Sequence, residues 1–401
     1  MARITMLLEN NPYPQDVRVR SEATSLAAAG HRVTVIAPRA QGQGRRETIA
    51  GVEVVRFALP ESPPTVAGYV LEYAIANARL YLAGAAALVR NADVVHLHNP
   101  PDTFFGVGLL ARACGRKVVF DHHDLAPELF EEKLGNRSVA RVLRAFERWT
   151  FRVATVVLAA NESHREVAIA RGGVDPAAVV IVRNGPPEAA VAAATTGRSG
   201  ELSRPQLVFL GGMEEQDGVD QLVPVLQALR DRHDLAADLT LVGDGSRRPA
   251  IEAQAAASGL GDSVRFTGRV GHDEVPRLLA AADICLDPAP CTPLNERSTM
   301  VKIAEYMAAR RPLVAYPLLE TRRTAGDTAL YAKCADVKSF AAAVAQLARD
   351  PELRACLAAH GHARVADLTW EASEQHLLTA YGAMLSGSGP RSSHRRSESA
   401  R

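Results

Sequence analysis

The sequence predicts an α/β protein made of two doubly wound, Rossmann-like domains that face each other across a cleft. The chain has 401 residues, which is too long for one ordinary hydrophobic core. Short apolar runs alternate with helical stretches in both halves, a pattern typical of parallel sheets with crossover helices. A stretch rich in Ala, Thr, Gly, Ser and Pro, at residues 186–205, separates the halves as a linker would.

The expected domain boundaries follow from these changes in composition. The alternation stops at the start of this stretch, resumes after it, and ends in a Ser- and Arg-rich segment. We therefore expect an N-terminal domain at residues 1–187, a linker at 188–204, a C-terminal domain at 205–369, a final helix at 370–385 and a disordered tail at 386–401.

The composition excludes several classes of protein. Hydrophobic residues make up 47% and charged residues 23%, and 46 basic against 45 acidic residues give a net charge of +1. So small a net charge provides no bulk field to hold a nucleic acid. No uncharged stretch reaches the roughly 20 apolar residues of a membrane helix, and the first residues lack the order of a signal peptide. We expect a cytoplasmic protein with no nucleic-acid partner.

The five cysteines are an odd number and include no C-x-x-C pair. They are Cys114, Cys285, Cys291, Cys334 and Cys356. This usage argues against a disulfide framework and against a zinc knuckle, so we expect reduced thiols in the cytoplasm.

The first half is predicted to begin with a strand at residues 3–8 and a loop at 10–14. Asp16 is placed to cap the helix that follows, and Gly30 to end it. The later strands of this half are expected at residues 31–37, 52–57, 94–98, 118–121, 155–159 and 179–182.

The second half repeats this scheme. A strand at residues 206–210, a turn at Gly211 and Gly212 and a helix at 218–230 are expected first. Further strands are expected at residues 239–242, 264–267, 284–287 and 312–315. Because open α/β sheets bind ligands outside the carboxyl ends of their strands, the residues just after each strand are the candidates for function.

The most informative segment is residues 293–308. Ser298 or Thr299 is placed to cap a helix whose first backbone N–H groups would bind phosphate. Lys302 and Glu305 are three residues apart and share a face of this helix. An ammonium beside a phosphate and a carboxylate beside a ribose diol suit a sugar nucleotide. Spacing alone favours the other interpretation, an amphipathic helix with an exposed Lys–Glu pair.

Residues 298–308, which read S-T-M-V-K-I-A-E-Y-M-A, resemble the donor-binding signature of retaining family-4 glycosyltransferases with the GT-B fold. Six other stretches resemble motifs of this family in the same order: D-V-R-V-R-S-E at 16–22, D-H-H-D-L-A-P-E at 121–128, R-N-G-P at 183–186, L-V-G-D-G at 241–245, V-R-F-T-G at 264–268 and W-E at 370–371. The resemblance covers about residues 3–385. It implies transfer of a sugar from a nucleotide diphosphate to a hydroxyl acceptor, and a C-terminal helix that returns to the first domain.

The resemblance also implies the roles of individual residues. The leaving phosphate would take the acceptor proton, so no dedicated base is expected, and neither is a metal or a cofactor beyond the donor, for which a UDP-sugar is favoured. The expected catalytic residues are His123, Asp124, Glu296 and Lys302. The expected donor-binding residues are Gly211, Gly212, Arg297, Ser298, Thr299, Lys302 and Glu305. The expected acceptor-side residues are Asn10, Asn11, Asp16, Arg18, Asn99, Asp102 and His122.

One departure from the family matters. Much of the family carries G-R-x-x-x-x-K-G after the first strand of the second domain, and this Arg and Lys clamp the donor diphosphate. Here Gly212 and Asp217 occupy those positions, so both cations are missing. We infer that Arg297 and Lys302 replace the missing charge. A sugar-nucleotide epimerase or hydrolase on the same fold, and a non-catalytic sugar-nucleotide or glycan-binding protein, are the alternatives.

Two further groups of residues have alternative interpretations. His96, His98, His122 and His123, with Asp121 and Asp124, suit either a divalent-metal site or neutral hydrogen-bonding groups in a sugar cleft. The resemblance favours the second, with His123 facing the transferred sugar.

A basic stripe at Arg137, Arg141, Arg144 and Arg148 suits either an anionic membrane or a solvated helix face with Glu147 as partner. We favour the solvated face, and keep a weak peripheral contact with the inner face of the membrane as the alternative.

Overall fold

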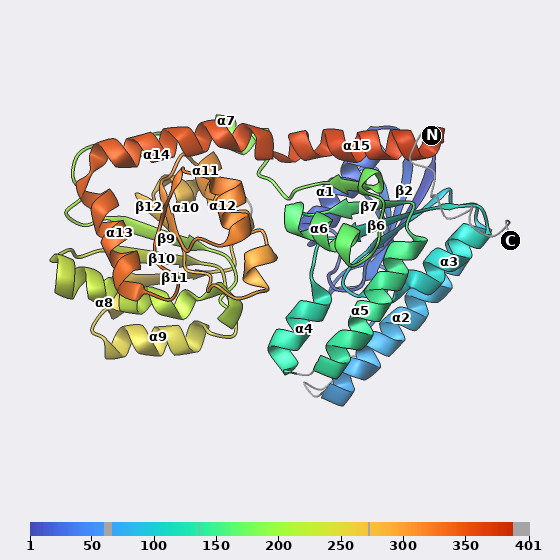
Figure 1. Ribbon diagram of the computed structural model, residues 1–401, viewed down its shortest axis with the longest axis horizontal. Helices are drawn as coiled ribbons and strands as arrows, with labels where there is room; N and C mark the ends of the chain where they lie inside the picture. The colour runs from blue at the N-terminus through green and yellow to red at the C-terminus, as the bar shows by residue number, and fades with distance from the viewer. Residues whose placement is uncertain (60–65, 136, 272, 388–401) are drawn as a thin grey trace, which may run out of the picture. The chain divides into compact units, whose positions relative to one another are not determined.

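The computed structural model describes residues 1–59, 66–135, 137–271 and 273–387, which form two compact units (Figure 1). The first unit comprises Met1–Arg183 together with the chain from Ser373 onward, and the second comprises Asn184–Ala372. Within the expected linker, Glu188–Ala192 forms a short helix, α7, of the second unit. Most of the tail expected at 386–401 lies outside the described residues. Among those that are described, no helix has the length and hydropathy needed to cross a membrane.

The first unit is built on an eight-stranded sheet in the order β3-β4-β2-β1-β5-β6-β7-β8. Its strands are β1 (Arg3–Leu7), β2 (Arg32–Pro38), β3 (Arg46–Ile49), β4 (Val52–Phe57), β5 (Val94–His98), β6 (Lys117–His122), β7 (Val156–Ala159) and β8 (Val179–Ile181). Its helices are α1 (Val17–Ala28), α2 (Val66–Val89), α3 (Phe105–Ala113), α4 (Ala126–Leu134), α5 (Arg137–Val153), α6 (Glu162–Ala170) and most of α15 (Trp370–Ser386), with short 3-10 turns at Asp102–Phe104 and Pro176–Ala178. Every pairing is parallel except the hairpin of β3 and β4.

All the strands expected in the first half are present, to within a residue or two at their ends. Asp16 caps α1, since its Oδ1 accepts a hydrogen bond of 3.0 Å from the Val19 backbone N–H. Gly30, with φ +86°, follows the helix as predicted. The sequence did not reveal β3, because this polar, mostly exposed edge strand lacks an apolar face. From Ser373 on, α15 belongs to this unit, which confirms the returning helix.

The second unit contains a six-stranded parallel sheet in the order β11-β10-β9-β12-β13-β14. Its strands are β9 (Gln206–Leu210), β10 (Asp238–Val242), β11 (Val264–Gly268), β12 (Ile284–Asp287), β13 (Leu313–Ala315) and β14 (Ala329–Tyr331). Its longer helices are α8 (Leu222–His233), α9 (Arg248–Ala257), α10 (Val275–Ala280), α11 (Val301–Ala308), α12 (Leu319–Ala325), α13 (Val337–Arg349) and α14 (Pro351–Arg364). The sequence missed the short strand β14. The helix expected at 218–230 begins only at Leu222, because 3-10 turns at Glu215–Asp217 and Val219–Gln221 precede it.

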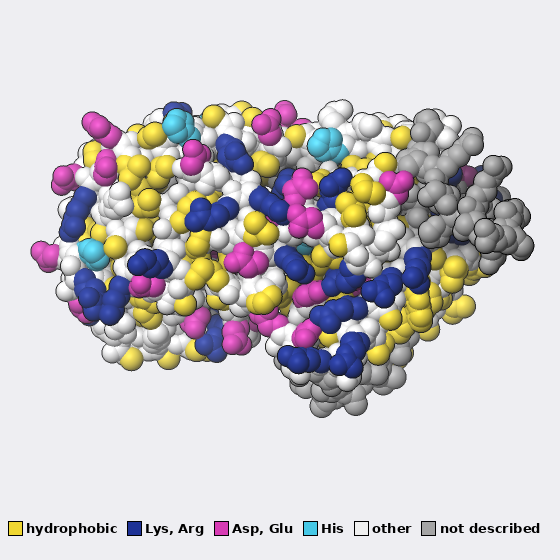
Figure 2. Space-filling view, viewed as in Figure 1, with side chains coloured by type: hydrophobic (Ala, Val, Ile, Leu, Met, Phe, Trp, Pro, Cys, Tyr) yellow, Lys and Arg dark blue, Asp and Glu magenta, His cyan; other side chains and the backbone are white. Residues whose placement is uncertain are grey.

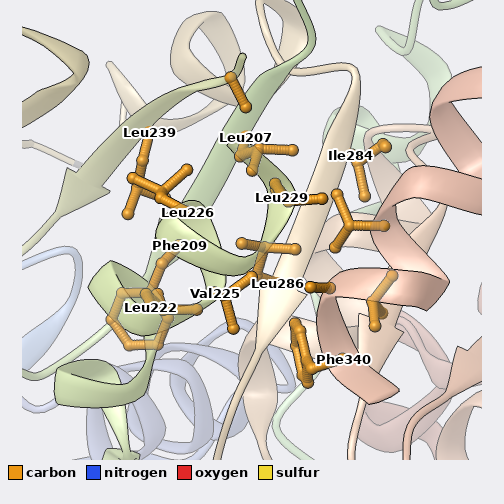
Figure 3. Packing of buried hydrophobic residues seen from close by; sticks show 14 of the residues in the cluster. Leu207, Phe209, Leu222, Val225, Leu226, Leu229, Leu239, Ile284, Leu286 and Phe340 are labelled. Carbon is orange, nitrogen blue, oxygen red and sulfur yellow. The ribbon is translucent and has the colours of Figure 1, made fainter. Parts of the chain in front are cut away.

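The core of the second unit shows why its sheet is doubly wound. Strand side chains alternate between the two faces, so Leu207 and Phe209 point to one side of β9 and Val208 to the other. The first face packs against α8 and α13, as Figure 3 shows around Phe340. The second packs against α10, α11 and α12. The sheet thereby holds α11, the helix with the candidate donor residues, at the carboxyl ends of β9 and β12.

One expectation about the cysteines is wrong. Cys291 and Cys334 form a disulfide with Cα atoms 6.0 Å apart, while Cys114, Cys285 and Cys356 are free thiols. The two bonded residues lie 43 positions apart in the chain. They meet because Cys291 follows β12 and Cys334 follows β14, and parallel strands bring their carboxyl ends to one edge of the sheet. No local sequence pattern reports such a long-range approach.

Candidate functional site

The start of α11 differs from the prediction. Met300 is the N-cap residue and no side chain caps the helix, so the expected capping by Ser298 or Thr299 is wrong. The reason is that Ser298 closes the preceding 3-10 turn, Asn295–Arg297, and its hydroxyl donates to the Leu294 carbonyl oxygen at 2.9 Å. The first turn of α11 is therefore not occupied by a capping oxygen, which keeps it suitable for an anion.

Lys302 lies at the centre of a small charged cluster. Its Nζ is 3.3 Å from Asp217 Oδ1 and 3.5 Å from Asp287 Oδ1, and lies 4.5 Å from the centre of the Phe209 ring. The side chain of Lys302 is only 8% exposed, so the interpretation as an exposed Lys–Glu pair is wrong. We refer to Lys302, Asp217 and Asp287 as the Lys302 cluster.

The carboxylates on this side of the sheet are held in a poorly solvated environment. Burial raises the pKa of Asp287, and the attraction of Lys302 offsets only part of this effect. Burial likewise raises the pKa of Glu305, which is half-buried one turn after Lys302. A carboxylate in such surroundings gains strongly from hydrogen-bond donors such as ribose hydroxyls.

Glycines bring the backbone close to Lys302. Gly211 has φ +145°, and a Cβ on it would lie 3.0 Å from Lys302 Cε. A Cβ on Gly243, at φ +132°, would lie only 2.0 Å from the Gly211 carbonyl oxygen. A Cβ on Gly212 would lie 3.2 Å from Asp217 Oδ2. The turn at Gly211 and Gly212 therefore packs between the Lys302 side chain and the turn after β10, and it tolerates no larger residue at its first position.

Tyr306 lies within the segment that resembles the donor motif, but the sequence indicates no role for it. The buried Tyr306 hydroxyl accepts from the Leu210 backbone N–H at 2.9 Å and donates to the Leu286 carbonyl oxygen at 3.1 Å. Tyr306 thus connects α11 to the ends of β9 and β12. Asp287 was also missed, although a carboxylate at the end of a buried strand is a signal that could have found it.

Glu296 and Arg297 precede α11. Glu296 Oε2 accepts from the Leu319 backbone N–H at 2.5 Å, and so interacts with the start of α12. Arg297 is exposed. Among the residues predicted at the donor site, the structure brings Gly211, Gly212 and Lys302 together, and Asp217 lies beside them.

In the first unit, Asp121 at the end of β6 is the centre of a second cluster. It accepts from Arg18 Nε at 2.8 Å and Nη2 at 2.6 Å, and contacts Nδ1 of His98 at 3.0 Å and of His123 at 2.8 Å. Glu22 Oε1 lies 3.2 Å from Arg18 Nε. Glu22 Oε2 lies 3.6 Å from His96 Nε2. We refer to these residues as the Asp121 cluster.

Burial and charge set the protonation of the Asp121 cluster. Burial lowers the pKa values of His96 and His98, as expected for neutral rings. Burial acts the same way on His123, but the Asp121 carboxylate overrides it and raises the pKa of His123 to about 9. Burial and Asp121 together raise the pKa of Glu22 to about 8. These shifts favour neutral rings for His96 and His98 and a charged ring for His123.

Glu22, His96, His98 and Asp121 form the one group of potential metal ligands among the described residues, with ligand atoms within 4.8 Å of one another. Arg18, however, contacts both carboxylates of this group. Its guanidinium already places a positive charge beside both carboxylates, where a metal ion would lie. The group therefore fits a buried ion-pair network better than a metal centre.

The other acceptor-side candidates divide into two sets. Asn99 Oδ1 accepts from the backbone N–H groups of His123 at 2.9 Å and Asp124 at 3.2 Å. Asn99 Nδ2 donates to Asp102 Oδ1 at 3.0 Å. Asn10, Asn11 and the helix cap Asp16 lie in the loop after β1. His122 does not join either set. Its Nε2 contacts the buried Glu147 at 3.1 Å.

The partner predicted for the basic stripe is wrong. Glu147 is fully buried and pairs with His122 and Arg171, whose guanidinium lies 2.6 Å away. Its position on α5 explains this, since Glu147 occupies the face that packs on the sheet. Arg144 contacts Glu131 of α4 at 2.5 Å instead, and Arg148 Nε donates to the Arg171 carbonyl oxygen at 3.2 Å.

Both halves of the chain match known protein families. Residues 15–185 match the family described as glycosyl transferase 4-like domain, and residues 204–350 the family described as glycosyl transferases group 1. The glycogen synthase of Mycobacterium tuberculosis strain H37Rv is 25% identical over 351 residues, which cover 82% of this chain and 81% of that protein. The D-inositol 3-phosphate glycosyltransferase of Salinispora arenicola is 31% identical over 197 residues, 47% of this chain and 43% of that protein.

Solved structures also resemble the fold. The sucrose-phosphate synthase of Thermosynechococcus elongatus has a TM-score of 0.69 at 20% identity, with 96% of this chain and 100% of that one covered. WaaG, a glycosyltransferase involved in lipopolysaccharide biosynthesis, has a TM-score of 0.70 at 19% identity, with 93% and 99% covered. HepE from Anabaena, in complex with UDP and glucose, has a TM-score of 0.68 at 15% identity, with 96% and 100% covered.

Proposed function

From the premise that the chain is a glycosyltransferase with the GT-B fold, we propose that it moves a hexose-type sugar, with retention, from a nucleotide diphosphate to a hydroxyl acceptor. The first half of the chain belongs to the glycosyl transferase 4-like family, and the second half belongs to glycosyl transferases group 1. Two solved relatives carry UDP with glucose or UDP-2-fluoro glucose, which makes a UDP-sugar our preferred donor. The relatives named above act in carbohydrate or inositol chemistry. We infer a hydroxyl of a glycan, a lipid-linked glycan or a natural product as the acceptor.

The Lys302 cluster is the observation that carries this proposal. A diphosphate at the uncapped first turn of α11 would meet backbone N–H groups and the ammonium of Lys302. It would displace Asp217 and Asp287 as partners of that ammonium. The distances from Lys302 Nζ to these two carboxylates, 3.3 and 3.5 Å, are long for charged hydrogen bonds. Arg297 would add the second positive charge, and Glu305 would accept from the ribose hydroxyls.

Catalysis would consist mainly of positioning and charge stabilisation. As the glycosidic bond breaks, negative charge grows on the leaving phosphate, and Lys302 would stabilise it more than it stabilises the bound donor. The same phosphate would take the acceptor proton. In the first unit, His123 has Nδ1 bonded to Asp121, which leaves Nε2 to donate to a sugar hydroxyl. We leave His122 out of the acceptor surface because it contacts Glu147.

Ligand-observed NMR with UDP-, GDP-, ADP- and dTDP-sugars tests the proposal, and calorimetry then measures the affinity of the donor that binds. Glu305→Gln should bind this donor about 10 to 100 times more weakly, from the roughly 1.5–3 kcal/mol of a charged hydrogen bond. Glu352→Gln, on the exposed start of α14, is the matched control and should bind normally. No donor binding, or binding unaffected by Glu305→Gln, would exclude this site. Turnover without acceptor would favour a hydrolase or epimerase.

A further inference from the structure

Three helices of the first unit expose apolar side chains on one continuous face. The helix α3 packs against α2 on one side, where Gly106 lies against Tyr81, and against α5 on the other, where Phe105 lies 5.0 Å from Trp149 between ring centres. The exposed apolar residues are Leu82 and Val89 on α2, Leu109 and Leu110 on α3, and Val139, Val142 and Trp149 on α5. Leu82 is 72% exposed and Leu109 56%, so this face is not a covered core.

The same face carries arginines and hardly any compensating acid. Arg137, Arg141, Arg148 and Arg152 are exposed along α5, and Arg112 is exposed on α3. Among the side chains that the structure describes on α2, α3 and α5, the one carboxylate is Glu147, and it is buried. Figure 2 shows basic side chains beside a broad apolar area over these helices. We refer to these apolar and basic residues together as the three-helix face.

The neighbouring acids reach only the start of α5 on this face. They belong to α4, where Glu128 pairs with Arg171, and Glu131 pairs with Arg144 and, at 3.9 Å, with Arg137. Glu132 is exposed on the same helix. On α5, residues 141, 148 and 152 fall within one sector of the helix, next to the sector that holds Val142 and Trp149. The basic edge and the apolar edge are therefore parallel along the helix.

We propose that the three-helix face binds the surface of an anionic membrane. Arginines beside exposed leucine, valine and tryptophan match the two layers of such a surface, because the guanidinium groups meet lipid phosphates while the apolar side chains enter the acyl boundary. The near absence of exposed carboxylates favours an anionic lipid surface over a protein partner, whose interface would pair charges of both signs. The inference does not depend on the identity of the donor.

Vesicle binding by the full chain tests the proposal. The wild type should sediment with phosphatidylcholine vesicles that contain 30% phosphatidylglycerol, release at high salt, and ignore pure phosphatidylcholine. The double variant Arg141→Glu/Arg152→Glu should lower the partition coefficient at least about 30-fold, since each arginine near the surface contributes roughly fivefold. The matched control Arg232→Glu/Arg265→Glu makes the same charge change on exposed residues of the second unit and should bind as the wild type does.

Tryptophan fluorescence tests whether the apolar edge enters the bilayer. The chain has two tryptophans, so Trp370→Phe leaves Trp149 as the single reporter. Its emission should shift to the blue with anionic vesicles and be quenched by brominated lipid. No sedimentation of the wild type at low salt, or equal sedimentation of the reversed variant, would overturn the proposal. So would a lipid-free dimer, seen by light scattering, that Arg141→Glu/Arg152→Glu dissociates, because it would assign this face to a second copy.

Discussion

The two units place charge at the carboxyl ends of their strands in opposite ways. In the Asp121 cluster, a buried carboxylate receives a guanidinium at 2.6 and 2.8 Å and two imidazoles at 2.8 and 3.0 Å. In the Lys302 cluster, one ammonium lies 3.3 and 3.5 Å from two carboxylates. The first arrangement is saturated with short contacts, whereas the second is loose enough to exchange a partner.

This difference separates charges that hold the fold from charges that are available to a ligand. Arg18 and Asp121 are 103 positions apart in the chain, and their contact joins α1 to the end of β6. Arg18 also donates to the Val182 carbonyl oxygen at 2.7 Å, beyond the end of β8. The contacts of Lys302 instead come from a turn and a strand end within one edge of the second sheet. We expect substitutions in the first cluster to act mainly on stability and those in the second mainly on turnover.

The largest effect is expected for Asp121→Asn. Removing this carboxylate leaves the buried Arg18 without its main partner, and breaking a buried ion pair costs about 3–5 kcal/mol. Urea unfolding followed by circular dichroism should show this loss. Asp124→Asn, a half-buried neighbour, is the control and should lose less than about 1 kcal/mol. A normal stability for Asp121→Asn would mean that the cluster does not hold the fold.

Lys302→Ala should lower the single-turnover rate about 100-fold while weakening donor binding less, because the ammonium faces charge that grows in the transition state. Arg297→Ala should behave similarly if the two cations replace the missing clamp. Lys338→Ala, an exposed lysine on α13, is the control. Rapid-quench kinetics and calorimetry measure the two quantities. A loss of affinity equal to the loss of rate would indicate that Lys302 stabilises ground state and transition state alike.

The pKa of His123 predicts how stability depends on pH. Its folded pKa of about 9 lies above the ordinary value of 6.5, so the charged ring stabilises the fold below about pH 6.5. This contribution is lost as the pH rises through 9, with a slope of at most about 1.4 kcal/mol per pH unit for one proton. Unfolding free energies measured from pH 6 to 10 should fall, and His123→Gln should flatten the curve. Parallel curves for the two proteins would contradict the assignment.

Asp217→Asn should have a smaller effect of opposite sign. It removes a negative charge that lies 3.3 Å from Lys302 Nζ and would lie near the diphosphate. We expect donor affinity to rise about tenfold, or roughly 1.4 kcal/mol, in calorimetry. Asp231→Asn, on the exposed end of α8, should change nothing. Weaker binding in Asp217→Asn would mean that Asp217 serves to position Lys302 rather than to oppose the donor.

The sequence predicted most of the fold because apolar strands and helix caps are determined by consecutive residues. Asp16 caps α1 as its side chain and position require, and the strands of both sheets lie where apolar runs predicted them. The short strands β3 and β14 escaped notice because few of their residues are buried. The family motif also located Lys302 and Glu305 on one helix.

What the sequence did not show depends on contacts between distant segments. The bond between Cys291 and Cys334 and the pairing of Lys302 with Asp217 and Asp287 arise only when parallel strands bring their ends together. His122 and His123 are neighbours in sequence, yet adjacent residues of a strand point to opposite faces, which sends His122 towards Glu147. The predicted charge partner of the arginine stripe failed for the same kind of reason, since Glu147 lies on the buried face of α5.

The smallest expected effect is that of chelation, where we expect less than a twofold change. If Arg18 takes the place of a metal ion beside Glu22 and Asp121, EDTA should leave both the transfer rate and the melting temperature unchanged. Complete loss of transfer, restored by a divalent ion, would contradict this, and the melting temperature would show where the ion binds. A metal in the Asp121 cluster would stabilise the free protein, because binding to the folded state alone raises its stability. A metal bound with the diphosphate near Lys302 would change the melting temperature only when donor is present, and would itself replace the missing cation clamp.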